Sequence, residues 1–373
     1  MQNTILDNGS NECTGCSACA AICPTSAIYM GYDENGFYVP FLEENKCIEC
    51  GLCKEVCYKY LEDSHITPRD DYKSKPVLAV TNNYVEQMHL VSTSGVATQL
   101  AKHYFKKGYK VCGAAFNDDF TGCEHIVARD VYDIIKFKGS KYLQSACSRA
   151  FSQLIKTSKK SIIFGTPCQI YGIRKLIKLK KIEDSFILVD LFCVGVPSLN
   201  LWVQYKDFIS RNYNLENLKQ VNFRDKTQGW HKYSIKVINA SGLEYRENIF
   251  NDMFFSFYLK KVCLNKPCYD CKLRHNAVYS DIRLGDFWGD KYSSYDDGVS
   301  IMVLLTKRGE KAWDSIKTSF RFEECKTEDI FISQKYNKIE IPEPYNEVIK
   351  ALQNKEKLEK INAKFGIHKL GYK

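Results

Sequence analysis

The feature that most constrains this chain is the spacing of eight of its 17 cysteines. Two runs near the N-terminus share the pattern C-x2-C-x2-C-x3-C. The first run is Cys13, Cys16, Cys19 and Cys23, and a proline follows it. The second run is Cys47, Cys50, Cys53 and Cys57, and Tyr58 follows it. The two-residue gaps let three thiolates of one loop face one cubane, while the fourth cysteine is carried to the other cubane. The spacing predicts a bacterial-type ferredoxin module with two [4Fe–4S] clusters.

The expected ligand sets are crossed between the two runs. One cluster takes Cys13, Cys16, Cys19 and Cys57. The other takes Cys47, Cys50, Cys53 and Cys23. Small residues between the ligands let backbone N–H groups approach the sulfides. A pair of zinc knuckles is the alternative, but zinc sites use two C-x2-4-C pairs and gain nothing from a third and fourth cysteine in each run.

Length and charge narrow the protein class further. With about 150 residues per domain, the 373 residues suggest two or three domains. The start has no signal-peptide pattern and no run of 18 apolar residues occurs, so we expect a cytosolic protein without a membrane span. The net charge of +9 divides into −5 for residues 1–60 and +14 for the remainder. The basic part would attract an acidic cofactor or redox partner. No nucleic-acid-binding signature accompanies it, so we expect no nucleic-acid partner.

Hydrophobic patterning divides the chain after the cysteine runs. Apolar runs at 76–80, 110–116, 161–165, 186–192 and 300–306 alternate with helical spacing at 96–107, 148–160 and 168–181. This alternation predicts an α/β domain of flavoprotein-like type with a largely parallel sheet, so that the whole chain is of the α+β class. We expect a ferredoxin domain at 1–62, a linker at 63–75, the α/β domain at 76–342 and a charged helical tail at 343–373, which docks on or caps the rest.

A second group of cysteines lies in the α/β part. Cys168 follows the strand at 161–165, with Thr166 expected as helix N-cap and Pro167 as the first helical residue. The helix dipole at that position should lower the pKa of the Cys168 thiol. Cys193 ends the next strand, and the carboxyl ends of neighbouring parallel strands lie along one sheet edge.

Downstream, Cys268 and Cys271 form another C-x2-C pair, and with Cys168 and Cys193 they are enough for a third [4Fe–4S] cluster. The alternatives are a zinc site or four unrelated packing cysteines. Cys263 is a rival ligand, but it lies within an expected helix. The cysteines without metal spacing are interpreted as packing residues: Cys112, Cys123, Cys147 and Cys325.

Together these residues resemble a known family, the β subunits of coenzyme F420-reducing hydrogenases and related dehydrogenases. The matching stretches lie between residues 91 and 289: VSTSGVATQLA, FKGSKYLQS, FGTPCQIYGIRK, LFCVGVPS, FRDKTQGWHKYS, KPCYDCK and SDIRLGDFWG. The resemblance implies a flavin (FAD in the hydrogenase subunits, FAD or FMN here). In the family the flavin exchanges a hydride with the deazaflavin coenzyme and single electrons with the clusters. The substrate of this chain does not follow from the resemblance.

Two segments are candidates for holding the flavin diphosphate. Ser92, Ser94 and Gly95 open a helix, and a helix N-terminus binds phosphate well. The second segment offers a turn, a hydroxyl and a cation from Gly139, Ser140 and Lys141. An ordinary helix cap and an ordinary turn are the alternatives.

Candidate catalytic residues surround Trp230. Arg224, Lys226 and His231 could hold an acidic substrate or a reduced, anionic flavin, and a solvated hairpin with a buried tryptophan is the alternative. Three residues of a later motif are interpreted in the same way: Asp281, Asp286 and Trp288.

The sequence therefore predicts a flavin-containing iron–sulfur oxidoreductase of an anaerobe. Its expected partners are a redox protein or catalytic subunit and a small-molecule hydride carrier. The competing hypothesis is an electron-carrier subunit without a substrate of its own, docked on a separate catalytic chain. Nicotinamide turnover is disfavoured because no G-x-G-x-x-G opens a helix.

Overall fold

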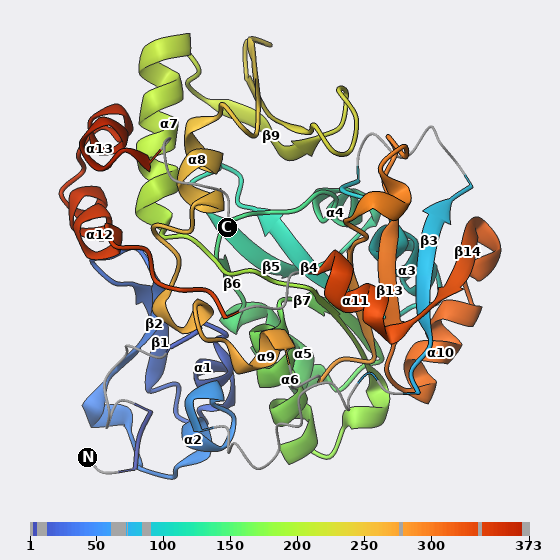
Figure 1. Ribbon diagram of the computed structural model, residues 1–373. Coiled ribbons are helices and arrows are strands. Elements are labelled where there is room, and N and C mark those ends of the chain that lie inside the picture. Colours follow the sequence, from blue (N-terminus) through green and yellow to red (C-terminus); the bar gives the residue numbers. More distant parts are fainter. Residues whose placement is uncertain are drawn as a thin grey trace.

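The computed structural model of the chain describes residues 3–5, 13–60, 72, 74–83, 91–275, 279–334 and 338–367. Most of the expected linker at 63–75 and the last six residues of the expected tail lie outside the described residues. Figure 1 shows the N-terminal module in blue at the lower left, beside the large central sheet. Within the described chain, no helix is both long and apolar enough to cross a bilayer.

The N-terminal module is a small hairpin with short helices that carry or precede cysteines. Strands β1 and β2 pair in antiparallel fashion, with Ile28 opposite Leu42. The elements of the module are α1 (Ala18–Ile22), β1 (Ile28–Tyr32), β2 (Tyr38–Leu42), η1 (Glu44–Lys46), α2 (Leu52–Glu55) and η2 (Tyr58–Tyr60). Cys23 is the C-cap residue of α1, so that helix carries it away from the other cysteines of its run.

A nine-stranded sheet forms the centre of the molecule, in the order β14-β3-β13-β12-β8-β7-β4-β5-β6. Four neighbouring strands at its centre, β12, β8, β7 and β4, are parallel, and antiparallel pairs flank them. The strands are β3 (Val77–Asn82), β4 (Lys110–Phe116), β5 (Cys123–Val127), β6 (Ser145–Ala146), β7 (Ser161–Gly165), β8 (Phe186–Leu191), β12 (Ile282–Asp286), β13 (Ser300–Leu304) and β14 (Phe320–Cys325). The carboxyl ends of the parallel strands meet at one edge, where ligands of α/β proteins usually bind.

Helices cover both faces of this sheet. On one face, α3 (Val96–Lys106), α4 (Val131–Lys136) and α10 (Lys307–Asp314) pack with Ile162 and Val189. On the other, α5 (Ser148–Thr157) and α6 (Pro167–Leu179) pack with Ile163 and Leu188. A further short helix, α11 (Thr327–Ser333), covers β3 and β13. The result is a three-layer α/β/α arrangement.

A second, three-stranded antiparallel sheet stands above the first in Figure 1, with the order β11-β10-β9. It consists of β9 (Leu218–Asp225), β10 (Ser234–Asn239) and β11 (Glu244–Asn248), and it shares one apolar core with α7 (Leu199–Tyr213) and α8 (Met253–Leu259). The same core includes the C-terminal helices α12 (Tyr345–Gln353) and α13 (Leu358–Phe365), which lie beside α7. Buried residues such as Val348, Leu352 and Ile361 attach the tail, so its described part is a structural element of the body.

The N-terminal module is packed tightly onto the body. Ala18, Ile22 and Val56 of the module belong to the same buried cluster as Phe151 and Ile170 of α5 and α6. Because this apolar surface is continuous, the module and the body share one hydrophobic core.

Neutral hydrogen bonds reinforce this contact. The side chain of Gln144 accepts from the Tyr38 amide at 2.7 Å and donates to the Thr14 carbonyl at 3.1 Å. Ser198 donates to the Asn35 carbonyl at 2.6 Å, and Asn200 donates to the Glu34 carbonyl at 3.0 Å. In each case a body side chain bonds a main-chain atom of the module.

The expected fold class is confirmed, and so are the five strands and three helices that hydrophobic patterning predicted. The second sheet was not predicted from the sequence. Its three strands carry many polar and charged residues, and the FRDKTQGWHKYS segment spans the β9–β10 turn. Trp230 in that turn is fully buried, as the hairpin alternative required, but Arg224 and Lys226 are buried as well, so the hairpin is not a solvated one.

Candidate metal centres and substrate site

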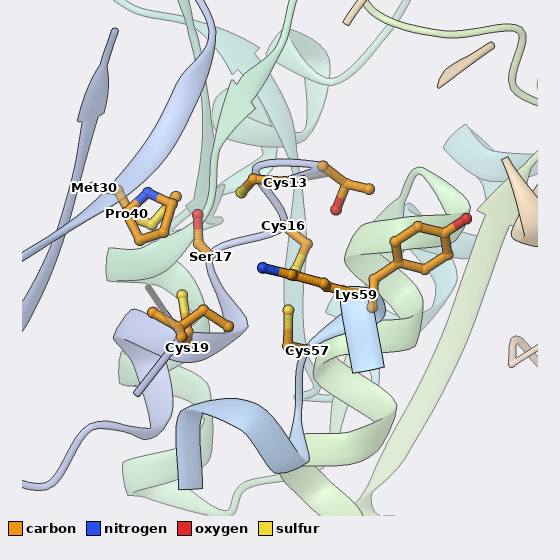
Figure 2. Close-up of a pocket in the computed structure, with 11 residues that line it drawn as sticks. Cys13, Cys16, Ser17, Cys19, Met30, Pro40, Cys57 and Lys59 are labelled. Atoms are coloured by element: carbon orange, nitrogen blue, oxygen red, sulfur yellow. The ribbon is translucent and has the colours of Figure 1, made fainter. Parts of the chain in front are cut away.

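The first cavity of the N-terminal module is lined by four cysteines from both runs. They are Cys13, Cys16, Cys19 and Cys57. Figure 2 shows their side chains around one space, with the Lys59 ammonium pointing into it. The backbone N–H of Gly15 donates to the Cys13 sulfur at 3.4 Å, as expected for small residues between ligands. The fourth cysteine of the second run therefore faces the first three cysteines of the first run.

The thiols of this cavity are strongly shielded from water. Burial raises the pKa of Cys13 and Cys57 to about 12 and that of Cys16 to about 11, and neighbouring thiols contribute to each rise. The pKa of Cys19 is raised well above its usual value for the same reasons. Without a bound cation these groups hold their protons, so binding of a metal cluster must release them. A cationic group such as Lys59 favours the thiolate form.

The second cavity is lined by the complementary set of cysteines. They are Cys23, Cys47, Cys50 and Cys53. The Ala27 amide donates to the Cys23 sulfur at 3.2 Å. Cys50 is exposed, and so is the neighbouring Ile48, which makes this cavity the outer one of the two.

The third group of cysteines meets at the carboxyl edge of the central sheet. Burial raises the pKa of Cys193 to about 12, and the nearby thiols of Cys168 and Cys271 add to the rise. The pKa of Cys268 is raised well above normal by burial and then by Cys193 and Cys271. The structure thus brings together all four cysteines that were grouped from the sequence. Their role as ligands of a third cluster stays a prediction.

Local geometry fixes two of these loops against each other. Gly195 lies in the loop that follows β8, two residues after Cys193, and has a φ of 151°. A Cβ at this position would lie 2.8 Å from the Cys268 Cβ. The Asn265 amide donates to the Val196 carbonyl at 2.9 Å. A larger residue at 195 would separate the Cys193 loop from the C-x2-C loop, so glycine is required for the close approach.

The start of α6 has the predicted cap residues, but the pKa of the Cys168 thiol differs from the prediction. Thr166 is the N-cap in a capping box with Gln169, and Pro167 is the first helical residue. However, burial raises the pKa of Cys168 to about 12, and the expected lowering by the helix dipole is wrong. Desolvation disfavours the thiolate more than the helix N-terminus favours it.

Two other buried cysteines, Cys263 and Cys147, lie outside the third cysteine group. Cys263 is buried in the core under α7 and α8. Cys147 is fully buried at the junction of module and body, where its thiol lies 3.5 Å from the Cys16 carbonyl and accepts from Gln169 at 3.3 Å. Among the described residues, no three His, Cys, Asp or Glu side chains are arranged to hold a single metal ion.

Two of the expected flavin anchors are in direct contact. The Ser92 hydroxyl accepts from the Ser140 amide at 2.9 Å, and the two hydroxyls are also 2.9 Å apart. Ser94 donates to Ser300 at 2.6 Å, at the start of β13, and Gly95 has a φ of 78° as the N-cap of α3. The α3 N-terminus and the 139–141 turn therefore form one polar surface at the sheet edge.

Lys141 is positioned differently from its expected role. Its ammonium donates to the carbonyls of Lys136, Lys138 and Gly139 at 2.7, 2.8 and 3.2 Å. Burial lowers its pKa to about 8. In this arrangement Lys141 neutralises the carboxyl end of α4 and shapes the turn that presents Ser140. Direct contact with a phosphate would have to displace these carbonyls.

The candidate residues around Trp230 converge with those of the later motif. Arg224 forms a two-pronged ion pair with Asp286, at 2.9 and 3.2 Å. The Trp230 indole donates to the same carboxylate at 3.2 Å and stacks on Trp288 at 4.7 Å between ring centroids. The Arg224 guanidinium also lies 4.0 Å from the Tyr233 ring centroid. Arg224 is 2% exposed, and its Nε finds no hydrogen-bond partner in the described structure.

Lys226 extends this site toward the α3 N-terminus, whereas His231 contacts the backbone at Tyr292. Lys226 donates to the carbonyls of Thr93 and Asp297 at 3.3 and 2.6 Å, and burial together with Arg224 lowers its pKa to about 8. The Nε2 atom of His231 lies 3.2 Å from the Tyr292 carbonyl.

Asp281 lies away from the other candidates. It accepts from the Leu188 amide at 2.8 Å and pairs with Arg174 at 3.3 Å. These contacts join β12 to β8 and α6, so the structure gives Asp281 a scaffold role rather than a place beside Arg224.

Two family models match the chain. Residues 12–59 match a 4Fe-4S dicluster domain. Residues 158–330 match the C terminus of the beta subunit of coenzyme F420 hydrogenase/dehydrogenase. The chain therefore combines a 4Fe-4S dicluster domain with a region that is similar to the C terminus of these beta subunits. The family resemblance derived from the sequence is confirmed.

Individual relatives share low identity over most of the chain. An F(420)H(2) dehydrogenase subunit of Methanosarcina mazei is 22% identical over 312 residues, which cover 82% of each chain. The coenzyme F420-dependent sulfite reductase of Methanocaldococcus jannaschii is 22% identical over 347 residues, 84% of this chain but 47% of that protein. A chain of the solved F420-reducing [NiFe] hydrogenase complex of Methanosarcina barkeri is 18% identical, with coverage of 82% and 94% and a TM-score of 0.49.

The dicluster domain and these relatives make the chain an iron–sulfur electron-transfer protein related to F420-dependent oxidoreductases. One charged residue beside the third cysteine group was not predicted from the sequence. Arg274 is 7% exposed and donates to the carbonyls of Cys193, Val194 and Cys268. The only sequence feature that could have identified Arg274 is its position three residues after Cys271. An arginine next to a C-x2-C pair indicates a neighbouring anionic site when it is buried.

Proposed function

We propose that this chain moves electrons between three [4Fe–4S] clusters and a flavin that exchanges hydride with an acidic small molecule. The observation that carries the proposal is the crossed lining of the two module cavities. Each cavity collects three cysteines of one run and the fourth of the other, which is the ligand pattern of two-cluster ferredoxins. Four thiols per cavity, with N–H groups near the sulfurs, suit a cubane, and Lys59 adds a cation to the first cavity.

The third cysteine group provides the site for a further cluster at the sheet edge, beside the module. Cys168 neighbours Cys16 of the first cavity as well as Cys271. The first module cavity is therefore a neighbour of the third group, which lies at the carboxyl edge of the sheet. Electrons that enter at the exposed Cys50 side would reach the sheet edge through this order of sites.

A flavin is the group we assign to the polar surface at the α3 N-terminus. When bound, a flavin exchanges both single electrons and hydride, which a chain of cubanes joined to a hydride carrier requires. Ser92 and Ser140 offer hydroxyls, and the first turn of α3 offers backbone N–H groups for a diphosphate. Lys141 holds the turn in place through its carbonyl contacts.

The neighbouring site around Arg224 is suited to hold an anionic group. Asp286 fixes the guanidinium by two hydrogen bonds, while the Tyr233 ring restricts it from another side. A buried guanidinium with an unpaired N–H and an adjacent lysine attracts a carboxylate or phosphate. Trp230 and Trp288 provide an apolar wall that excludes water from the same region.

The stoichiometry of iron, sulfide and flavin in anaerobically purified protein tests the proposal. Three cubanes correspond to about twelve irons per chain, with one flavin released by heat. The Cys193→Ala variant should lose about four irons and keep the module clusters. Cys325→Ala, on the edge strand β14, is the matched control and should keep the wild-type iron content.

Two results would contradict parts of the proposal. A wild-type protein with about eight irons would exclude the third cluster. Absence of flavin from cluster-replete protein, even after incubation with FAD or FMN, would leave the electron-carrier subunit as the function.

A further inference from the structure

The two cysteine runs differ in the residue that follows their last ligand. Cys23 is followed by Pro24, whereas Cys57 is followed by Tyr58. Tyr58 begins the short helix η2 and is 8% exposed. The module alone does not require a large buried aromatic residue after the last cysteine of a run, because the first run has a proline there.

The side chain of Tyr58 reaches from the module into the body. It is part of the wall of the first cavity, next to Cys57. Its hydroxyl accepts from the Lys272 amide at 2.8 Å, and Lys272 directly follows Cys271 of the third cysteine group. Tyr58 therefore contacts both candidate cluster sites.

Packing holds the ring in this position. Tyr58 forms a small buried cluster with Tyr171 and Leu273, against which Cys168 and Cys271 pack. The Tyr171 ring meets it edge to face, at 6.2 Å between centroids. The ring has little freedom to turn away because neighbours from α6 and from the C-x2-C segment enclose it.

We infer that Tyr58 is the positioning residue that couples the first module cluster to the third cluster. Its bond to Lys272 joins the Cys57 loop and the Cys271 loop through one aromatic ring and one hydrogen bond. One electron would leave one site and enter the other, with no proton transferred and no covalent bond made or broken. The inference rests on the proposed function, because it requires clusters at both sites.

The test removes the hydrogen bond between Tyr58 and Lys272 in two ways, by deleting its acceptor or its donor. Tyr58→Phe keeps the ring and deletes the acceptor. Lys272→Pro deletes the donor, and proline is tolerated there because Lys272 is the first residue of helix α9 (Lys272–His275). Lys272→Ala retains the N–H and is the control for the second variant, while Tyr60→Phe is the control for the first.

After flash reduction by a photochemical one-electron donor, we would follow the redistribution of one electron between the clusters by magnetic resonance of samples frozen at successive times. Tyr58→Phe and Lys272→Pro should retain the wild-type iron content and lose several-fold in the rate of redistribution. Spin–spin coupling between the two reduced clusters should weaken in parallel. Both control variants should behave as wild type.

Two outcomes would overturn the inference, and they are distinguishable. Wild-type protein with about eight irons removes the third cluster, and with it both the proposed function and this inference. Wild-type protein with about twelve irons, together with unchanged rates in Tyr58→Phe and Lys272→Pro, overturns the inference alone.

Discussion

The fourth cysteine of each run has a different environment from the first three. Cys23 lies beyond the end of α1, which carries Cys19, and Cys57 lies beyond α2, which carries Cys53. Each fourth cysteine therefore follows the short helix that holds the third cysteine of its run. This displacement lets each line the cavity of the other run. Sequence spacing alone predicted this, because the three-residue gap is the local cause of the separation.

Substitution of the fourth cysteine of one run should therefore have the same effect as substitution of a cysteine in the other run. We expect Cys57→Ala to resemble Cys13→Ala, with loss of the cluster in the first cavity. Cys23→Ala should instead resemble Cys47→Ala. Magnetic resonance spectra of the four reduced variants check this, since the surviving cluster identifies which site was lost. A spectrum of Cys57→Ala that matches Cys47→Ala would show that the ligand sets are not crossed.

Other residue-scale properties could not be predicted from neighbouring sequence. The acidity of Cys168 depends on its burial between module and body, which outweighs the helix N-terminus that the sequence revealed. The partnership of Arg224 and Asp286 joins residues 62 positions apart. Burial and long-range pairing are properties of the complete fold, so short motifs could identify these residues but not their contacts.

At the scale of elements, α6 has a dual role. Its first turn carries Cys168, and one turn later Gly172 allows α1 of the module to approach closely. A Cβ at position 172 would lie 2.8 Å from the Ala18 Cβ and 3.3 Å from the Cys16 sulfur. The glycine therefore sets the distance between α6 and the loop that supplies the first cavity.

Gly172→Ala tests this contact. Helix propensity alone would favour alanine by about 1 kcal/mol, but overpacking of a tight contact costs roughly 1–3 kcal/mol. We expect a net loss of stability, seen as a lower urea midpoint for loss of cluster absorbance.

Ala18→Gly removes the nearest atom, so the double variant should recover part of that loss and show a favourable coupling in the double-mutant cycle. Additive effects of the two substitutions would indicate that the helices do not compete for this space.

The strands differed in how well sequence patterning predicted them. Continuous apolar runs such as those of β7 and β8 identified the buried parallel centre. The strands β9, β11 and β14 carry many charged residues and pair only with antiparallel neighbours, so their patterns resemble polar loops. Their place in the sheets depends on partners distant in sequence, which a single-sequence pattern does not reveal.

At the scale of the whole molecule, module and body form one packed unit. Gln144 is 5% exposed and bonds both Tyr38 and Thr14 of the module. The apolar cluster shared by α1, α5 and α6 continues the same contact. The domain boundary near residue 62 stays a prediction, and we expect the module and the body to unfold together because they share these contacts.

We expect cluster absorbance and far-ultraviolet circular dichroism of the wild type to change in one common urea transition. Gln144→Leu leaves the Tyr38 amide unpaired, at a cost of about 1–3 kcal/mol. Its cluster absorbance should decline at lower urea than the body signal. Gln153→Leu makes the same replacement at an exposed position of α5 and should keep the common transition. Separate transitions in the wild type would contradict the shared core.

The bonds across this boundary have an evolutionary consequence. Gln144, Ser198 and Asn200 are side chains of the body, but their partners in the module are main-chain amides and carbonyls. Main-chain atoms persist whatever side chain a position carries, proline at a donor excepted. These four hydrogen bonds therefore survive substitution of the module residues that supply the main-chain atoms, whereas the three body residues are constrained. A lineage could alter the surface charge of its module to suit a new redox partner and keep the same body.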